Sequence, residues 1–182
     1  PLTVAGRDDV YVVCHGGPDP MHWGSSLGLV WAPNWRGPWT AMSNNSDDLL
    51  DSGRNLFAHP VEDPFFWHTP GDGQFHILCH GFRLGMVNRT EGSGNAYGLY
   101  ARAPTPFGPW KVQETNAIYG ADVAIRDGTT LHLYKRERPK LLLNAAGTPT
   151  VLFNGVCPSG SAEGGPTDPA GHCFTLAQPI SA

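Results

Sequence analysis

The chain has 182 residues and a net charge of −4, and its 23 glycines and 17 prolines make up about a fifth of it. This length suffices for one domain with a hydrophobic core, and the frequent Gly and Pro residues favour short strands over long helices. The acidic balance gives no basic surface for nucleic acid, and no apolar run approaches the roughly 20 residues that span a bilayer. The sequence therefore predicts an all-β domain, with neither nucleic acid nor a membrane as partner.

Two segments near the N-terminus recur later in the chain. The segment VYVVCHGG at 10–17 is repeated as QFHILCHGF at 74–82, and LGLVWAPNWRGPW at 27–39 is repeated as YGLYARAPTPFGPW at 97–110. In the second pair, a predicted strand is followed by a proline-rich turn and by Gly-Pro-Trp. Repetition of this kind indicates a fold built from copies of one supersecondary unit.

The second copy begins with the segment EDPFFWHTPGDGQFHILCHGF at 62–82, which opens on two acids before a proline. Acids are rare in strands, so Glu62 and Asp63 need either a structural partner or a chemical role. A hairpin turn centred near Gly71 places Glu62 opposite His80, because each lies nine residues from this glycine. Neighbouring strand residues point to opposite faces, so Glu62 and Asp63 project alike only if the backbone twists at the proline.

A third, partial copy follows as ERPKLLLNAAGTPTVLFNGV at 137–156. It has the same order of features: an acid, a proline, an apolar run, a glycine-containing turn and a second apolar run that ends in a polar residue and glycine. A turn near Ala146 brings Glu137 close to Asn154 and Gly155.

The repeated unit has roughly 65 to 75 residues and about four strands, which is typical of a β-propeller blade. We predict a single propeller over 1–182, with blades at 1–61 and 62–136 and a partial blade at 137–182. Propellers close with at least about four blades, so we expect an incomplete arc of about three blades, completed by the remaining blades of a parent chain. The alternative is a complete β-sandwich of duplicated four-stranded sheets.

The innermost strands of a propeller line its central axis, so the polar residues at their ends are expected to face a shared funnel. These candidate residues are His15, Glu62, His80, Glu137 and Asn154. Glu137 recurs where Glu62 stands, and a feature repeated in every blade equally fits a structural anchor. Asp63 is not repeated, which favours a special role there.

Basic and aromatic residues supply further candidates. The stretch Arg136–Arg138, with Glu137 between two arginines, can hold carboxylates or sugar hydroxyls. An ion-pair network between blades is the favoured reading of this stretch. Trp23, in the loop PDPMHWGSS, is the best candidate for stacking on a sugar, whereas Trp39 and Trp110 repeat at strand ends and are expected to pack between blades.

The four cysteines predict one disulfide and no metal site. Cys157 and Cys173 flank a loop rich in Gly, Pro and Ser and can close it, whereas Cys14 and Cys79 lie within apolar strands and are expected to be buried thiols. None has the spacing of a zinc site, and no metal or cofactor is expected.

Weak signals indicate an extracellular or secretory-pathway location. Asn44 and Asn88 each begin an N-glycosylation pattern in a polar loop. The chain starts at Pro1 without an initiator methionine, so we expect a processed form or a fragment.

The Glu-Asp-Pro before an aromatic strand, the Gly-Pro-Trp strand ends and the Arg-Glu-Arg-Pro stretch resemble five-bladed propeller glycoside hydrolases. The similarity is to the clan of glycoside hydrolase family 43 (arabinanase and xylosidase types) and the invertase-like enzymes, and it covers residues 1–156. It implies an oligosaccharide or polysaccharide substrate and inverting hydrolysis by three acids: a base from the first blade, a pKa-modulating Asp from the second and a Glu acid from the third. The Glu-Asp-Pro motif matches either of the last two, so the resemblance implies Asp63 as modulator or Glu62 as acid.

Cleavage of a glycosidic bond needs one protonated and one ionised carboxyl on opposite sides of the bond. Asp8 and Asp9 lie in a predicted turn away from the funnel, and Asp122 is weakly placed, so the sequence supplies no convincing base. We therefore expect the chain as given to be catalytically incomplete. The alternative is a carbohydrate-binding or scaffold propeller without catalytic activity.

Overall fold

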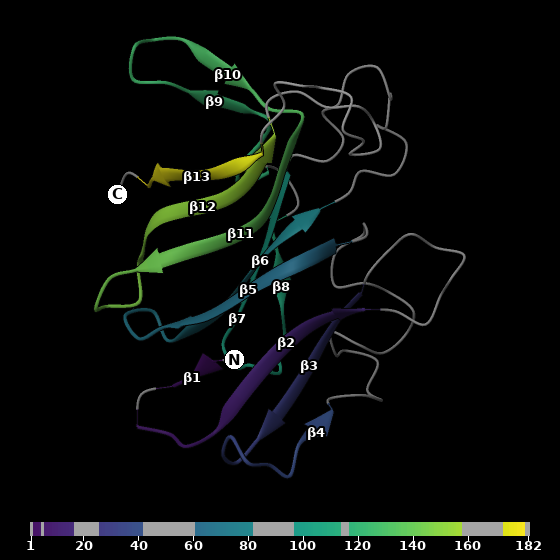
Figure 1. The fold of residues 1–182 in the computed structure, drawn as a ribbon. Helices are drawn as coiled ribbons and strands as arrows, with labels where there is room; N and C mark the ends of the chain where they lie inside the picture. Colours follow the sequence, from purple (N-terminus) through teal and green to yellow (C-terminus); the bar gives the residue numbers. More distant parts are fainter. Residues whose placement is uncertain are drawn as a thin grey trace.

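The computed structural model describes residues 2–4, 6–16, 26–41, 61–81, 97–113, 117–157 and 173–180. Every regular element in these residues is a β-strand, which confirms the all-β prediction (Figure 1). The described residues contain no helix that is long and apolar enough to cross a membrane.

The described strands form three larger antiparallel sheets and one separate hairpin. The first sheet consists, in order, of β1 (Leu2–Thr3), β2 (Val10–Gly16), β3 (Ser26–Ala32) and β4 (Thr40–Ala41). The second consists of β5 (Val61–Thr69), β6 (Gln74–Gly81), β7 (Tyr97–Ala103) and β8 (Lys111–Val112). The third consists of β11 (Lys135–Leu143), β12 (Pro149–Cys157) and β13 (Phe174–Pro179), and the hairpin of β9 (Asp122–Ala124) and β10 (Thr130–His132).

The first two sheets share one hydrogen-bonding register, which confirms the sequence repeat between them. Val10 pairs with Ala32 in the first sheet, and Phe75 pairs with Ala103 in the second. From these pairs onward, successive residues of β2 pair with successive residues of β3 without a shift, and the same holds for β6 and β7. The same holds at the outer edge, where β4 pairs with β3 as β8 pairs with β7.

The Gly-Pro-Trp tripeptides also adopt the same backbone in both copies. Gly37 and Gly108 have φ of 90° and 101°, and each precedes a cis proline bond. A Cβ at either glycine would lie 3.0–3.1 Å from the backbone nitrogen of Trp39 or Trp110, so this turn excludes larger residues. The two tryptophans differ in packing: Trp110 lies against Phe66, whereas Trp39 is 46% exposed. The prediction that both pack between sheets is therefore wrong for Trp39 in this chain.

The second sheet lies between the other two, and β5 contacts both β2 and β11 (Figure 1). Its strand β6 is buried from Phe75 to Gly81, because both faces are covered. The core shared with the first sheet contains Tyr11, Leu27, Leu29, Val61, Ile77, Cys79 and Ala101. The core shared with the third sheet contains Trp67, Leu78, Tyr119 and Leu152. Each large side chain buried here contributes about 1.5–3 kcal/mol, and three sheets in succession do not match a sandwich of two.

The expected blade boundaries at 61/62 and 136/137 stay predictions. The strand β5 begins at Val61 and β11 at Lys135, close to these boundaries. The β9–β10 hairpin lies outside the three larger sheets, and its Val123 packs with Val156 of β12 and with Leu133, which lies between β10 and β11.

Candidate functional site

Glu62 and His80 face each other across the first two strands of the second sheet. The turn between these strands is closed by the Gly73 N–H, which donates to the Thr69 carbonyl at 2.9 Å, and the register pairs Glu62 with His80 as predicted. His80 Nδ1 lies 3.2 Å from Glu62 Oε1. The imidazole is fully buried, whereas 28% of the Glu62 side chain is exposed. A buried ring thus positions a carboxylate that still reaches the surface.

A β-bulge follows this glutamate and recurs in the third sheet. The register of β5 shifts between Glu62 and Phe65, and that of β11 shifts between Glu137 and Lys140. Asp63 has a φ of 53°, and the equivalent residue in β11 has a φ of 56°; both are left-handed conformations that non-glycine residues rarely adopt. A backbone twist is therefore present at Asp63, directly before Pro64, where Glu62 and Asp63 need one to project alike.

Glu137 brings a second carboxylate to Glu62 and His80 from the third sheet. It pairs with Gly155, and the Asn154 side-chain amide donates to its carbonyl at 3.2 Å, so the predicted neighbourhood is confirmed. One side-chain oxygen or nitrogen from each of Glu62, His80 and Glu137 lies within 4.8 Å of the other two. We call these three residues the carboxylate–histidine cluster.

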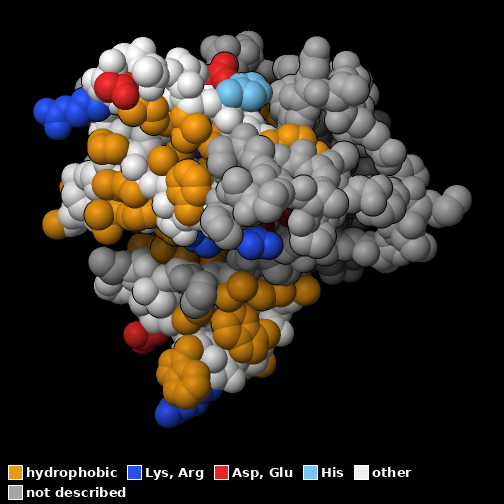
Figure 2. Space-filling view, turned by 45° about the horizontal axis from the view of Figure 1, so that its top comes forward, with side chains coloured by type: hydrophobic (Ala, Val, Ile, Leu, Met, Phe, Trp, Pro, Cys, Tyr) orange, Lys and Arg blue, Asp and Glu red, His pale blue; other side chains and the backbone are white. Residues whose placement is uncertain are grey.

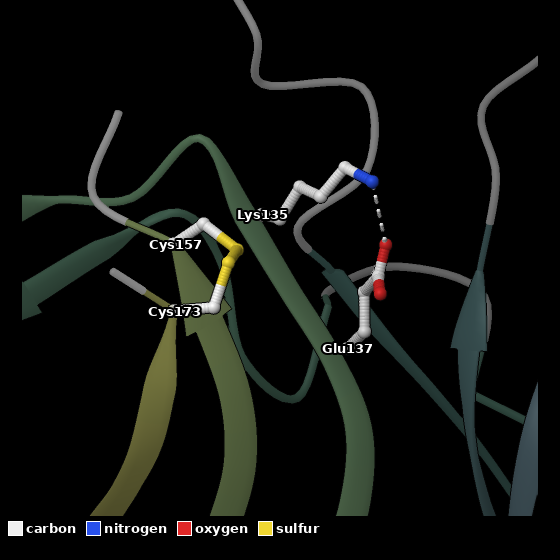
Figure 3. Close-up of a disulfide and its surroundings, with 4 residues drawn as sticks. All are labelled: Lys135, Glu137, Cys157 and Cys173. Atoms are coloured by element: carbon white, nitrogen blue, oxygen red, sulfur yellow. Dashed lines mark ion pairs between the residues drawn. A yellow bond between two sulfur atoms is a disulfide. The ribbon is translucent and has the colours of Figure 1, made fainter. Parts of the chain in front are cut away.

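A cation and a disulfide lie in the same sheet as Glu137 of this cluster (Figure 3). Lys135 Nζ lies 3.7 Å from Glu137 Oε1, and both side chains are partly exposed, so the pair contributes little stability. Lys135 pairs with Cys157, whose sulfur is bonded to that of Cys173. The predicted disulfide is present, and it joins the end of β12 to the start of β13 at the end of the sheet that carries Glu137.

The cluster offers one imidazole and two carboxylates, a set of ligands that suits a divalent cation. No metal site was predicted, because the spacing of the cysteines does not match a zinc site and says nothing about these three residues. Glu62, His80 and Glu137 come from three strands of two sheets, so no spacing along the chain identifies them as a group. The one feature of the sequence that indicated a shared location was the glutamate that recurs as Glu62 and Glu137 in two copies of the motif.

Arg136 and Asn154, both proposed from the sequence as ligand-binding residues, are buried between the second and third sheets. Arg136 Nε donates to Asn154 Oδ1 at 2.9 Å, and its other hydrogen bonds in the described part of the chain reach Gly120 and Gln178. The favoured interpretation, an ion-pair network, is therefore wrong for Arg136, because these partners are neutral. Arg138 occupies the bulge of β11 and is exposed.

Two of the three acids considered as a catalytic base, Asp9 and Asp122, have other partners. The Tyr11 hydroxyl donates to Asp9 at 2.8 Å and, together with the Arg7 guanidinium, lowers the pKa of Asp9. Burial, followed by this hydrogen bond, raises the pKa of Tyr11 to about 12. Asp122 pairs with His132 at 2.5 Å in the β9–β10 hairpin. Neither aspartate belongs to the carboxylate–histidine cluster.

Several predicted features lie outside the described residues. These are Trp23, the side chains of Cys14 and His15, and the glycosylation patterns at Asn44 and Asn88. For His15 the structure gives the backbone pairing alone, which places it opposite Leu27 as His80 is placed opposite Gly98.

Comparison with known proteins finds structural similarity alone. No family model and no curated protein matches the chain. The fold is similar to a GH43 β-1,3-galactosidase (11% identity, TM-score 0.46, covering 96% of this chain and 34% of that one). It is also similar to a xylan β-1,4-xylosidase from Bacillus halodurans (14% identity, TM-score 0.42, covering 97% of this chain and 38% of that one). A third similar structure is an exo-β-1,3-galactanase from Phanerochaete chrysosporium (12% identity, TM-score 0.41, covering 82% of this chain and 41% of that one). The chain thus spans between a third and about two fifths of these three structures.

Proposed function

We propose that the chain is an arc of a five-bladed β-propeller of the glycoside hydrolase type, which hydrolyses glycosidic bonds in oligosaccharides or polysaccharides. The observation that carries this proposal is the carboxylate–histidine cluster, in which Glu62, His80 and Glu137 meet within 4.8 Å from two neighbouring sheets. Glycoside hydrolysis depends on carboxyl groups beside the scissile bond, and Glu62 is a partly exposed carboxylate that a buried histidine positions.

The arrangement of the sheets supports the propeller reading. Two sheets repeat one register, and β5, the first strand of the second sheet, contacts β2 of the first sheet and β11, the first strand of the third. Hydrophobic side chains are exposed on the surface of both the upper and the lower parts of the molecule (Figure 2). Among the described residues, the exposed hydrophobic side chains include Trp39, which precedes β4, and Leu142 in β11, which are 46% and 53% exposed. Further blades of a ring would cover such surfaces.

We assign Glu62 the role of proton donor and His80 that of a positioning residue that holds its carboxylate. Inverting enzymes separate their two carboxyl groups by about 6.5–9.5 Å, and retaining enzymes by about 5–5.5 Å. The oxygens of Glu62 and Glu137 lie within 4.8 Å, too close for a water-activating base across the sugar. In the inverting mechanism that the sequence resemblance implies, the base is therefore a carboxylate other than Glu137. Asp63, in the bulge beside Glu62, is proposed as the modulator.

The test uses Glu62→Gln in the natural full-length protein. Glutamine keeps the shape of the side chain but cannot donate an acidic proton, so hydrolysis of glycosides with poor leaving groups should fall about 10²–10⁴-fold. Activated aryl glycosides need little protonation and should be affected much less. Asp63→Asn removes a carboxylate beside Glu62 and should move the limbs of the pH–activity profile without abolishing turnover. Asparagine tolerates the left-handed backbone of this residue, so the fold should be kept.

Glu137→Gln is the matched control, and it should reduce the hydrolysis of both substrate types alike. Equal, modest losses of activity in the Glu62, Asp63 and Glu137 variants, each in proportion to the fall in melting temperature, would show that these acids are structural. A carbohydrate-binding propeller without catalytic activity would then be the better description. One observation favours this alternative: among the described residues, no third carboxylate joins the cluster.

We further propose an extracellular or secretory-pathway location. The disulfide between Cys157 and Cys173 supports it, because disulfides persist in oxidising compartments. Enzymatic deglycosylation of the natural protein, followed by mass spectrometry of the Asn44 and Asn88 peptides, tests this location. Unmodified asparagines at both positions would remove the support that the glycosylation patterns give.

A further inference from the structure

Arg136 is a buried cation without an anionic partner among the described residues. Only 2% of it is exposed. Its Nε donates to Asn154 at 2.9 Å, Nη1 to the Gly120 carbonyl at 3.1 Å and Nη2 to Gln178 at 2.6 Å. A guanidinium has five N–H donors, so one remains on each terminal nitrogen. Burial lowers the pKa of this guanidinium, because a charge removed from water without a counter-charge is unfavourable.

Tyr119 supplies a second buried polar group at the same place. Its ring lies against the guanidinium, with Arg136 Cζ 4.7 Å from the ring centroid. The hydroxyl lies near the Asn154 amide but makes no hydrogen bond of standard geometry within the described part of the chain. Burial raises the pKa of this hydroxyl, so it remains a neutral donor at physiological pH. Buried hydroxyl groups rarely lack a hydrogen-bond partner, so this hydroxyl is evidence that a ligand binds here.

Both residues line a pocket of about 440 Å³ between the second and third sheets. Gln178, which holds one terminal nitrogen of Arg136, belongs to the same lining. The exposed lining is polar and apolar in equal parts, and its apolar part is mainly aliphatic, with Leu78, Ile118, Leu141, Leu152 and Ile180. Asp122 lies at the exposed rim, where it pairs with His132. A pocket that combines an aliphatic wall with a few convergent polar groups suits a small organic ligand that has an apolar and a charged part.

We propose that this pocket binds a small carboxylate with an aliphatic body, at a site separate from the carboxylate–histidine cluster. The two remaining N–H donors of Arg136 suit the two oxygens of a carboxylate, and the Tyr119 hydroxyl supplies a third donor. The aliphatic body lies against Leu78, Leu141 and Leu152. A uronic acid has the same charged group, but its hydroxyl-rich ring suits these walls less well.

The first test titrates the natural full-length protein with hexanoate, by calorimetry and by the shift in melting temperature. We expect saturable binding that raises the melting temperature. Hexanamide has the same body without the charge and should bind at least about tenfold more weakly, because hydrogen bonds to charged groups are the stronger ones. Glucuronate, the polar carboxylate, should also bind more weakly than hexanoate.

Two variants separate binding from folding. Tyr119→Phe keeps the ring over Arg136 and removes only the hydroxyl, so hexanoate affinity should fall about tenfold with little change in the melting temperature of the free protein. Asp122→Asn removes the negative charge at the rim and should strengthen binding. Undiminished binding by Tyr119→Phe, equal affinity for hexanamide, stronger binding of glucuronate, or no saturable hexanoate binding at about 10 mM would each overturn the proposal.

Discussion

At Gly98, the ring of Tyr119 packs directly against the backbone of β7. A Cβ on Gly98 would lie 2.4 and 2.5 Å from two carbons of this ring, closer than van der Waals contact allows. The Gly98 N–H donates to the Tyr119 carbonyl at 3.0 Å, and the Gly98 carbonyl accepts from the Ile118 N–H at 2.9 Å. The ring is 5% exposed and belongs to the core between the second and third sheets. The ring also lies against the Arg136 guanidinium, so a movement away from an added methyl group would disturb that contact and the core packing.

We expect Gly98→Ala to lower the free energy of unfolding by about 3 kcal/mol. An overpacked core costs about 1–3 kcal/mol, and loss of one of the two backbone hydrogen bonds adds about 1 kcal/mol. Urea unfolding of the natural protein, followed by tryptophan fluorescence, should show a lower midpoint with an unchanged slope. Gly71→Ala is the matched control: a Cβ at this exposed turn meets nothing within 4 Å, so its effect should be within about 1 kcal/mol.

The double variant Gly98→Ala/Tyr119→Leu identifies the cause of the loss. Leucine is smaller than tyrosine and leaves room for the added methyl group, so the two changes should cost at least about 1 kcal/mol less together than the sum of their separate effects. Additive effects, or a Gly98→Ala protein as stable as Gly71→Ala, would refute the reasoning from this close contact.

Three further predictions concern the cysteines and the exposed surface. Replacing Cys157 and Cys173 by serine opens a loop with a sequence separation of 16 and should lower stability by about 3 kcal/mol; a reductant that leaves the melting temperature unchanged would contradict this. Cys79 should resist thiol reagents at pH 8 in the native protein, because burial raises its pKa well above the usual value, and rapid native labelling would show the reverse. Because the thiol stays protonated in the folded protein, it causes no loss of folding stability below the unfolded-state pKa of about 8.5. Above that pH the unfolded chain can ionise and the folded protein cannot, so the free energy of unfolding falls as the pH rises towards the folded-state pKa. The isolated 182-residue chain should associate in sedimentation experiments through residues such as Trp39 and Leu142, whereas a monodisperse monomer would contradict the arc.

Local spacing along the sequence determined the strands, their repeat and the pairing within each hairpin. The equal spacing of Glu62 and His80 about Gly71 predicted the right pair, but the turn alone does not set it. The turn pairs Thr69 with Gln74, which by itself would place Glu62 opposite Gly81, and the bulge between Glu62 and Phe65 shifts the register by one residue to His80. In the third sheet, register shifts on both sides of Lys140–Leu142 likewise leave Glu137 opposite Gly155. The turn and the bulge both lie within one hairpin, so these pairs depend on local structure.

The tertiary structure decided which side chains from different sheets meet. The packing of Trp67, Leu78, Tyr119 and Leu152 between the second and third sheets brings Glu137 to Glu62 and His80, and no spacing along the chain encodes that approach. The same packing buries Arg136 among neutral partners, where the sequence had favoured ion pairs. Contacts between sheets depend on how whole faces fit together, and the neighbours of one residue in the sequence do not contain that information.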